Sequence, residues 1–175
     1  MADSIVGVHI YTVTQKRNRK SELISFTQSG DGARLKEYCP NFFEKYSSIK
    51  DDDSDVIRLW YFEPKPNNGA SFHGWIKYGS SGYESDIIDR KTRELLYERK
   101  ASDVDVIPLY YRLWVPSSGD FALLALQTFG QRSCVGRVQS ALESGFRASN
   151  PGFRLDLKPF IPAQLASFKQ HHYLL

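Results

Sequence analysis

Cysteine is scarce in this chain. Its only two cysteines, Cys39 and Cys134, lie far apart in segments of different character, and they form neither a C-x-x-C pair nor a dense framework. A disulfide scaffold and a four-cysteine zinc site both need more cysteines than this, so both classes are excluded. We expect the chain to work in a reducing cytoplasm and to need no cofactor.

Long hydrophobic runs are also missing. No stretch approaches the ~20 apolar residues of a membrane-spanning helix, and residues 1–16 lack a basic segment followed by an apolar core. Secretion and a membrane partner are therefore not expected. The 175 residues, 41% of them hydrophobic and 25% charged, are typical of one globular domain that buries its own core.

The net charge is small. Twenty-three Lys and Arg residues against 20 Asp and Glu residues leave +3, which does not by itself indicate a polyanionic partner. The distribution is uneven, because four carboxylates lie within residues 51–55 and the region after residue 116 is mildly basic. Four cations also lie within five residues: Lys16, Arg17, Arg19 and Lys20. The small average is therefore compatible with a locally basic binding face.

Segments of strand length, separated by glycine- and proline-rich turns, dominate the chain. Apolar alternation and β-branched content predict strands at 4–13, 56–63, 71–78, 83–89, 94–98, 104–115, 121–129 and 153–161, and a short uncertain one at 23–26. A polar, basic loop is predicted over residues 14–20. Pro108 is expected at a bulge or a strand entry, because it has no N–H to donate to a ladder.

One helix stands out after Gly130. Apolar residues recur at helical spacing over 133–148, Ser133 can cap the start, and the Asn-Pro-Gly sequence at 150–152 ends it. Short helices are predicted at 33–38, limited by Pro40, and at 163–170. The predicted fold is α+β: a mostly antiparallel sheet of about six to eight strands with one main helix packed on a face, in a single domain spanning residues 1–175.

Two anion-binding candidates follow from this layout. The first is the basic loop, since loops of this kind contact nucleic-acid backbones through charge. The second is the start of the main helix, where free N–H groups and arginine side chains suit a phosphate. Its residues are Arg132, Ser133 and Arg137. Solvated loops and simple helix capping are the ordinary alternatives.

Aromatic side chains offer a possible stacking platform for nucleic-acid bases. The candidates are Trp60, Tyr61, Phe72, Trp75, Tyr78 and Tyr83. Because they alternate with apolar neighbours, core packing is expected for most of them. Trp75 and His73 share the more polar face of their strand, and they are the exceptions.

One pattern indicates an enzyme. Residues 98–100 read E-x-K, with Glu98 and Lys100 at the end of one strand and with Asp86 and Asp89 on the preceding strand of the same hairpin. Carboxylates and a lysine in this arrangement hold Mg²⁺ and support the attacking water in one large nuclease superfamily. The alternative is an exposed hairpin with cross-strand charge pairs. Magnesium is expected only under the nuclease reading.

Two further features have alternative interpretations. Cys134 lies near a helix start and two arginines, which would lower its pKa, whereas an apolar neighbourhood makes it a buried small residue. The apolar residues Tyr173, Leu174 and Leu175 fit a tail that docks on a protein partner or a second copy of the chain. They also fit a chain that is a piece of a longer protein.

Four stretches resemble a pattern in uncharacterised bacterial proteins: 73–79 (HGWIKYG), 82–85 (GYES), 107–111 (IPLYY) and 127–130 (QTFG). Some of those proteins are found near mobile elements and phage-defence systems, and their layout is similar to that of phage-exclusion RexA proteins. The shared residues are turn glycines and apolar strand residues, so no catalytic role is transferred. The resemblance implies a bacterial, intracellular, antiviral setting with nucleic acid as a partner. The leading hypothesis is a non-enzymatic domain that binds nucleic acid or another polyanion.

Overall fold

A computed structural model describes residues 5–18, 22–48, 58–66 and 69–161. Four features named above lie outside these residues: Arg19 and Lys20, the acidic run, the short helix predicted at 163–170, and the apolar tail. The strands are β1 (Val6–Arg17), β2 (Leu23–Ile24), β3 (Arg58–Pro64), β4 (Ser71–Ser80), β5 (Ser85–Ile88), β6 (Leu95–Arg99), β7 (Asp105–Trp114), β8 (Ala122–Phe129) and β9 (Phe153–Pro159). A 3₁₀ turn (Gly30–Ala33) leads into helix α1 (Arg34–Lys45), and helix α2 (Val135–Ser149) lies between β8 and β9.

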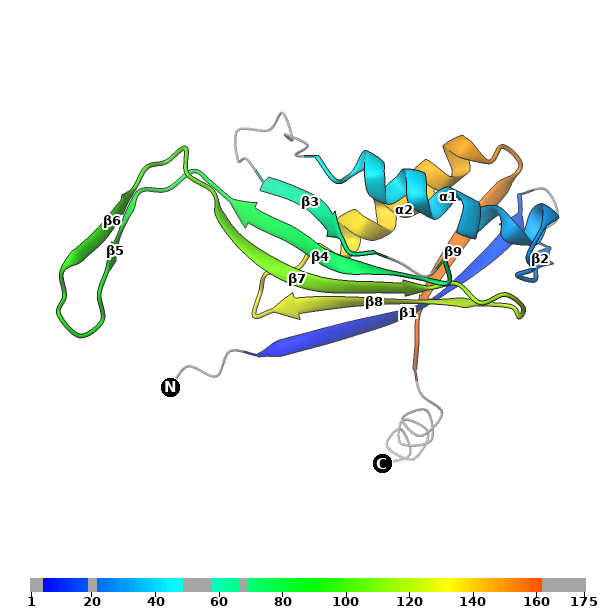
Figure 1. The fold of residues 1–175 in the computed structure, drawn as a ribbon, viewed down its shortest axis with the longest axis horizontal. Helices are drawn as coiled ribbons and strands as arrows, with labels where there is room; N and C mark the ends of the chain where they lie inside the picture. The colour runs from blue at the N-terminus through cyan, green and yellow to red at the C-terminus, as the bar shows by residue number, and fades with distance from the viewer. Residues whose placement is uncertain (1–4, 19–21, 49–57, 67–68, 162–175) are drawn as a thin grey trace, which may run out of the picture.

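Seven of the strands form one antiparallel sheet. Its order is β3-β4-β7-β8-β1, with β9 on the other edge of β1 and the short β2 beside the end of β1. Strands β5 and β6 form a separate two-stranded ribbon that projects from the body, at the left of Figure 1. The predicted α+β class, with its mostly antiparallel sheet and a main helix, is confirmed.

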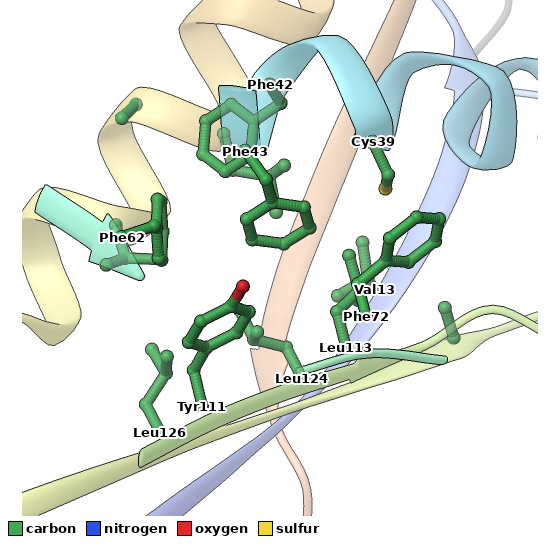
Figure 2. Close-up of a cluster of buried hydrophobic side chains, with 14 of the residues drawn as sticks. Val13, Cys39, Phe42, Phe43, Phe62, Phe72, Tyr111, Leu113, Leu124 and Leu126 are labelled. Carbon is green, nitrogen blue, oxygen red and sulfur yellow. The ribbon is translucent and has the colours of Figure 1, made fainter. Parts of the chain in front are cut away.

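Both helices lie on the same side of the main sheet (Figure 1). The core fills the space between them and the sheet, and Figure 2 shows Phe42 and Phe43 of α1 above Tyr111, Leu113 and Leu124. The rings of Phe43 and Tyr111 stack with their centroids 5.0 Å apart. None of the helices in the described part of the chain is both long and apolar enough to cross a membrane.

The predicted loop at 14–20 is wrong for its first four residues, which belong to β1. Gln15 and Lys16 pair with β2 on one edge and with β9 on the other, so both backbone edges of a polar segment are satisfied. Gln15 is fully buried, and its side-chain amide accepts the Leu35 N–H (3.1 Å) and donates to the Asp31 carbonyl (2.5 Å). Long-range pairing, which local composition does not reveal, makes this segment a strand.

Two predictions about proline are also wrong. Helix α1 continues through Pro40 to Lys45, because Phe42 and Phe43 beyond it are buried in the core. Burying two such side chains contributes ~1.5–3 kcal/mol each, which offsets the ~3 kcal/mol that an internal proline costs.

Pro108 lies inside the regular β4–β7 ladder, opposite Lys77, and not at a bulge or an entry. The N–H of Tyr110 points to the β8 side, where it donates to Gln127 Oε1 (2.8 Å). The nitrogen of Pro108, two residues earlier, faces the same side. Pairing between β7 and β8 begins only at Tyr111, so the missing N–H costs no ladder bond.

Tyr111 provides a test of the core. Its side chain is buried, and its hydroxyl, which points toward the helix layer in Figure 2, has no hydrogen-bond partner among the described residues. Burial raises the pKa of this hydroxyl. A buried hydroxyl without a partner costs ~1–3 kcal/mol, so we expect Tyr111→Phe to raise the free energy of unfolding in urea by about that amount. Tyr110→Phe, on the exposed side of the same strand, is the matched control and should leave stability nearly unchanged. A Tyr111→Phe protein less stable than wild type would contradict this account.

Candidate nucleic-acid interface

The side of the main sheet opposite the helices is covered by no described helix or strand. Side chains alternate between the two faces of a strand, and directly paired residues share a face. Trp75 pairs with Tyr110, and Trp114 pairs with Leu123, so all four lie on this uncovered side, which we call the open face. Trp75, Tyr110 and Trp114 are exposed to 36%, 36% and 40%. The rings of Trp75 and Tyr110 meet edge to face, with centroids 5.6 Å apart.

Cationic side chains are interleaved with these rings. Arg112 lies between Tyr110 and Trp114 along β7 and pairs with His73 on β4. Its Nε donates to Ser71 Oγ (2.9 Å), and it makes no ion pair with any carboxylate of the described residues. Lys77, which follows Trp75 on the same face, pairs with Glu63 at 3.1 Å.

The same face continues across β1 to the far edge of the sheet. Lys16 pairs with Arg154, and Thr12 pairs with Lys158, so these three cations also belong to the open face. Asp156 accepts from Lys16 Nζ at 2.5 Å and from Arg154 Nε at 3.3 Å. The open face thus carries five Lys or Arg side chains and two carboxylates, alongside exposed apolar residues of β1 such as Val8 and Ile10.

Arg17 does not share this face, because adjacent strand residues point to opposite sides. Its guanidinium lies on the helix side, 2.6 Å from Asp31, which also binds Arg34 at 2.6 Å. The two arginines flank the ring of Phe153, with distances to the ring centroid of 5.9 Å for Arg17 and 4.2 Å for Arg34. The hydrogen bonds from Arg34 and Arg17 hold the pKa of Asp31 below its usual range.

The second predicted anion site lies at the other end of the sheet. Gly130, at a φ of +56°, turns the chain after β8, and its N–H donates to the Ile5 carbonyl beside the start of β1. Lys16 is ten residues further along β1 than Val6, about 33 Å at ~3.3 Å per residue. The structure therefore places Lys16 far from the predicted anion site at the start of α2.

The start of α2 differs from the prediction. The helix begins at Val135, its N-cap residue is Cys134, and no side chain caps it, so the prediction that Ser133 caps the helix is wrong. Ser133 Oγ nevertheless accepts the Val135 N–H at 3.3 Å. Arg132 is held by Asp105 at 2.5 Å, which lowers the pKa of that carboxyl. Arg137, in the first turn, is half-buried. Of the two readings of Cys134, the buried one is confirmed, since burial raises its pKa to about 12.

The residues of the nuclease reading lie on the exposed β5–β6 ribbon. Asp86 and Glu98 are direct cross-strand partners and share a face. Asp89 is engaged in the hairpin turn, where Oδ1 accepts the backbone N–H groups of Lys91 (2.7 Å) and Thr92 (2.8 Å). Lys100 follows β6 and donates its backbone N–H to Asp103 (2.9 Å). In the described part of the chain, no three His, Cys, Asp or Glu side chains gather as a metal site.

The expectation that most of the six aromatic residues pack in the core is confirmed only in part: Trp60 and Phe72 are buried, Tyr61 and Tyr78 are half-buried, and Trp75 and Tyr83 are exposed. The sequence reasoning missed Tyr110, Arg112 and Trp114. A signal for them was present, because strict alternation in β7 places them opposite the buried Leu109, Tyr111 and Leu113.

The chain matches no family model, and neither a curated protein nor a solved structure was found to be similar to it. The resemblance to the phage-exclusion RexA proteins stays a prediction.

The Lys16–Asp156 pair gives a pH-dependent prediction. The hydrogen bond from Lys16 is the main cause that lowers the pKa of Asp156, and burial opposes it. Because the pKa of Asp156 is lower in the folded state, the pair stabilises the fold fully at pH values above the ordinary aspartate pKa of ~3.9. That stabilisation is lost as the pH falls through the lowered pKa. We expect Lys16→Met to raise the Asp156 pKa in a carbon-13 NMR titration. The same change should cost less than about 1 kcal/mol at neutral pH and nothing in strong acid. An unchanged Asp156 titration in Lys16→Met would contradict the assignment.

Proposed function

We propose that this domain binds single-stranded nucleic acid on the open face of its main sheet, without acting as an enzyme. One observation carries the proposal: Trp75, Tyr110 and Trp114 are exposed on a face that no described helix or strand covers, and Arg112, which makes no ion pair with a described carboxylate, lies among them. Exposed aromatic rings stack on unpaired bases, and cations between them neutralise phosphates.

The charge arrangement also supports a strand that crosses the sheet. The aromatic residues lie on β4 and β7, and the cations Lys16, Arg154 and Lys158 lie on β1 and β9 at the far edge. A single strand of nucleic acid that lies across the sheet contacts the aromatic rings on β4 and β7 and then the cations on β1 and β9. The bacterial and antiviral setting implied by the resemblance is part of this proposal. The proposed ligand is a single strand of either DNA or RNA.

Removing one ring tests the stacking contribution. We expect Trp75→Ala to weaken the binding of a fluorescent oligo(dT) or oligo(U) by roughly 5- to 100-fold, because base–aromatic stacking contributes ~1–3 kcal/mol per base. The matched control is Tyr97→Ala, which removes an exposed ring from the separate β5–β6 ribbon and should leave affinity unchanged. Equal losses in both variants, or no binding by the wild type at low salt, would overturn the proposal. Self-association of the chain that is lost in Trp75→Ala would instead assign the face to a protein partner.

The electrostatic contribution has its own readout. For single strands, the logarithm of the affinity falls with the logarithm of salt concentration by about 0.7 for each phosphate contact. We expect Arg112→Gln to reduce that slope by about 0.7. Arg90→Gln removes the same charge from the exposed hairpin turn, and its slope should match the wild type.

A Mg²⁺-dependent nuclease is the second candidate function. The observation that favours it is the direct pairing of Asp86 with Glu98, since two adjacent carboxylates on one face are ligands of the kind that Mg²⁺ takes. Under the leading proposal, we expect labelled DNA and RNA to stay intact when they are incubated with the protein and Mg²⁺. Cleavage that disappears in Glu98→Gln and with a chelator would establish the nuclease instead.

A further inference from the structure

A polar cavity of about 390 Å³ opens at the end of the main sheet, between the ends of β3 and β4 and the turn before α2. Its lining comes from three segments that are distant in sequence: Arg58, then Tyr78, Gly79, Ser80 and Ser81, then Gln131, Arg132 and Ser133. Two arginines and three serines therefore line one space. None of the described lining residues is acidic.

The first turn of α2 begins two residues after Ser133, the last lining residue of the cavity. A helix start has free N–H groups and a partial positive charge, and no acidic residue lies in the first turn to neutralise it. Gly136 in that turn leaves open space where a side chain would otherwise stand. The helix start is thus accessible to a ligand as well as positively charged.

Ser81 adds a hydroxyl to the cavity. The residue is only 6% exposed, and its hydroxyl makes no hydrogen bond to another described residue. The hydroxyl is not among the fully buried atoms that lack a partner, so it is open to the cavity and available to a ligand oxygen.

The two arginines differ in what holds them. Asp105 binds one nitrogen of Arg132 at 2.5 Å from outside the cavity, which orients the guanidinium while its other N–H groups remain available. Arg58 makes no ion pair with a carboxylate of the described residues. A group with three anionic oxygens and a double charge satisfies two guanidiniums, hydroxyls and helix N–H groups at once, and a phosphate monoester is such a group.

We infer that this cavity binds a phosphate monoester, either the terminal phosphate of a nucleic-acid strand or that of a free mononucleotide. The first source rests on the proposed function and extends it. Ser80 in the cavity is five residues from Trp75, about 17 Å along the strand, but Ser80 and its direct partner Arg58 lie on the helix side of the sheet, opposite Trp75. The end of a nucleic-acid strand stacked on Trp75 would therefore pass around the end of the sheet to reach the cavity.

The experiment has two parts, both on the full chain. In the first, inorganic phosphate and a nucleoside monophosphate are titrated, and the backbone amides are followed by nitrogen-15 NMR. We expect saturable shifts at Ser81, Gln131, Ser133 and Gly136. Arg58→Gln and Ser81→Ala should weaken these shifts, and the charge-matched control Arg90→Gln should not. Absence of saturable shifts at these amides overturns the inference.

In the second part, oligonucleotides with a terminal phosphate are compared with the same strands ending in a hydroxyl. We expect the phosphate to tighten binding by roughly tenfold or more, since hydrogen bonds to charged groups contribute ~1.5–3 kcal/mol. Arg58→Gln should abolish this preference, whereas Trp75→Ala should weaken both oligonucleotides alike.

The two parts separate the two proposals. If oligonucleotides bind without any terminal preference, and phosphate shifts no cavity amide, the proposed function stands and the cavity inference fails. If a nucleoside monophosphate occupies the cavity but no oligonucleotide binds, the inference holds with the free nucleotide as its ligand, and the proposed function fails.

Discussion

The rest of this structure depends on one constraint: both helices pack against the same side of a single antiparallel sheet. A strand beneath the helices therefore buries mainly every second residue, as β7 does with Leu109, Tyr111 and Leu113. The residues at the alternate positions, whose side chains point away from the helices, need only fit a pleated sheet. In this chain, these open-face positions carry tryptophan, tyrosine and arginine where short polar residues would suffice. This choice of side chains is the main indication of function.

The sheet also determines which charges act together. Lys16 and Arg17 are neighbours in sequence, but the strand sends one to the open face and the other to Asp31 on the helix side. Residues that are distant in sequence are brought together instead, such as Lys16 with Arg154, and Arg58 with Arg132 beside the cavity. The stacking groups lie on the open face, whereas the cavity lies at the end of the sheet and takes Arg58 and Ser80 from the helix side.

Much of the fold was predictable because hairpins and amphipathic helices are local patterns. The hairpins β3–β4, β5–β6 and β7–β8, the main helix and the exposure of Trp75 all follow from alternation and turn residues. The errors share one cause, which is tertiary contact overriding local preference. Pairing with β9, and with β2 at Gln15 and Lys16, made residues 14–17 part of a strand, and core burial carried α1 past Pro40. Pro108 is accommodated because β7 has no partner on its β8 side at that point.

The sequence by itself determined the α+β class, most of the strands and the alternation that marks Tyr110, Arg112 and Trp114 as a set. It did not determine which face of each strand the helices would cover, because that depends on where the helices pack in the folded chain. It also did not show that Arg58, Ser81 and Arg132 line one cavity, since loops of unknown path separate them in the chain. Only the tertiary structure decided these points, because the faces and ends of a sheet are shared by strands that are distant in sequence.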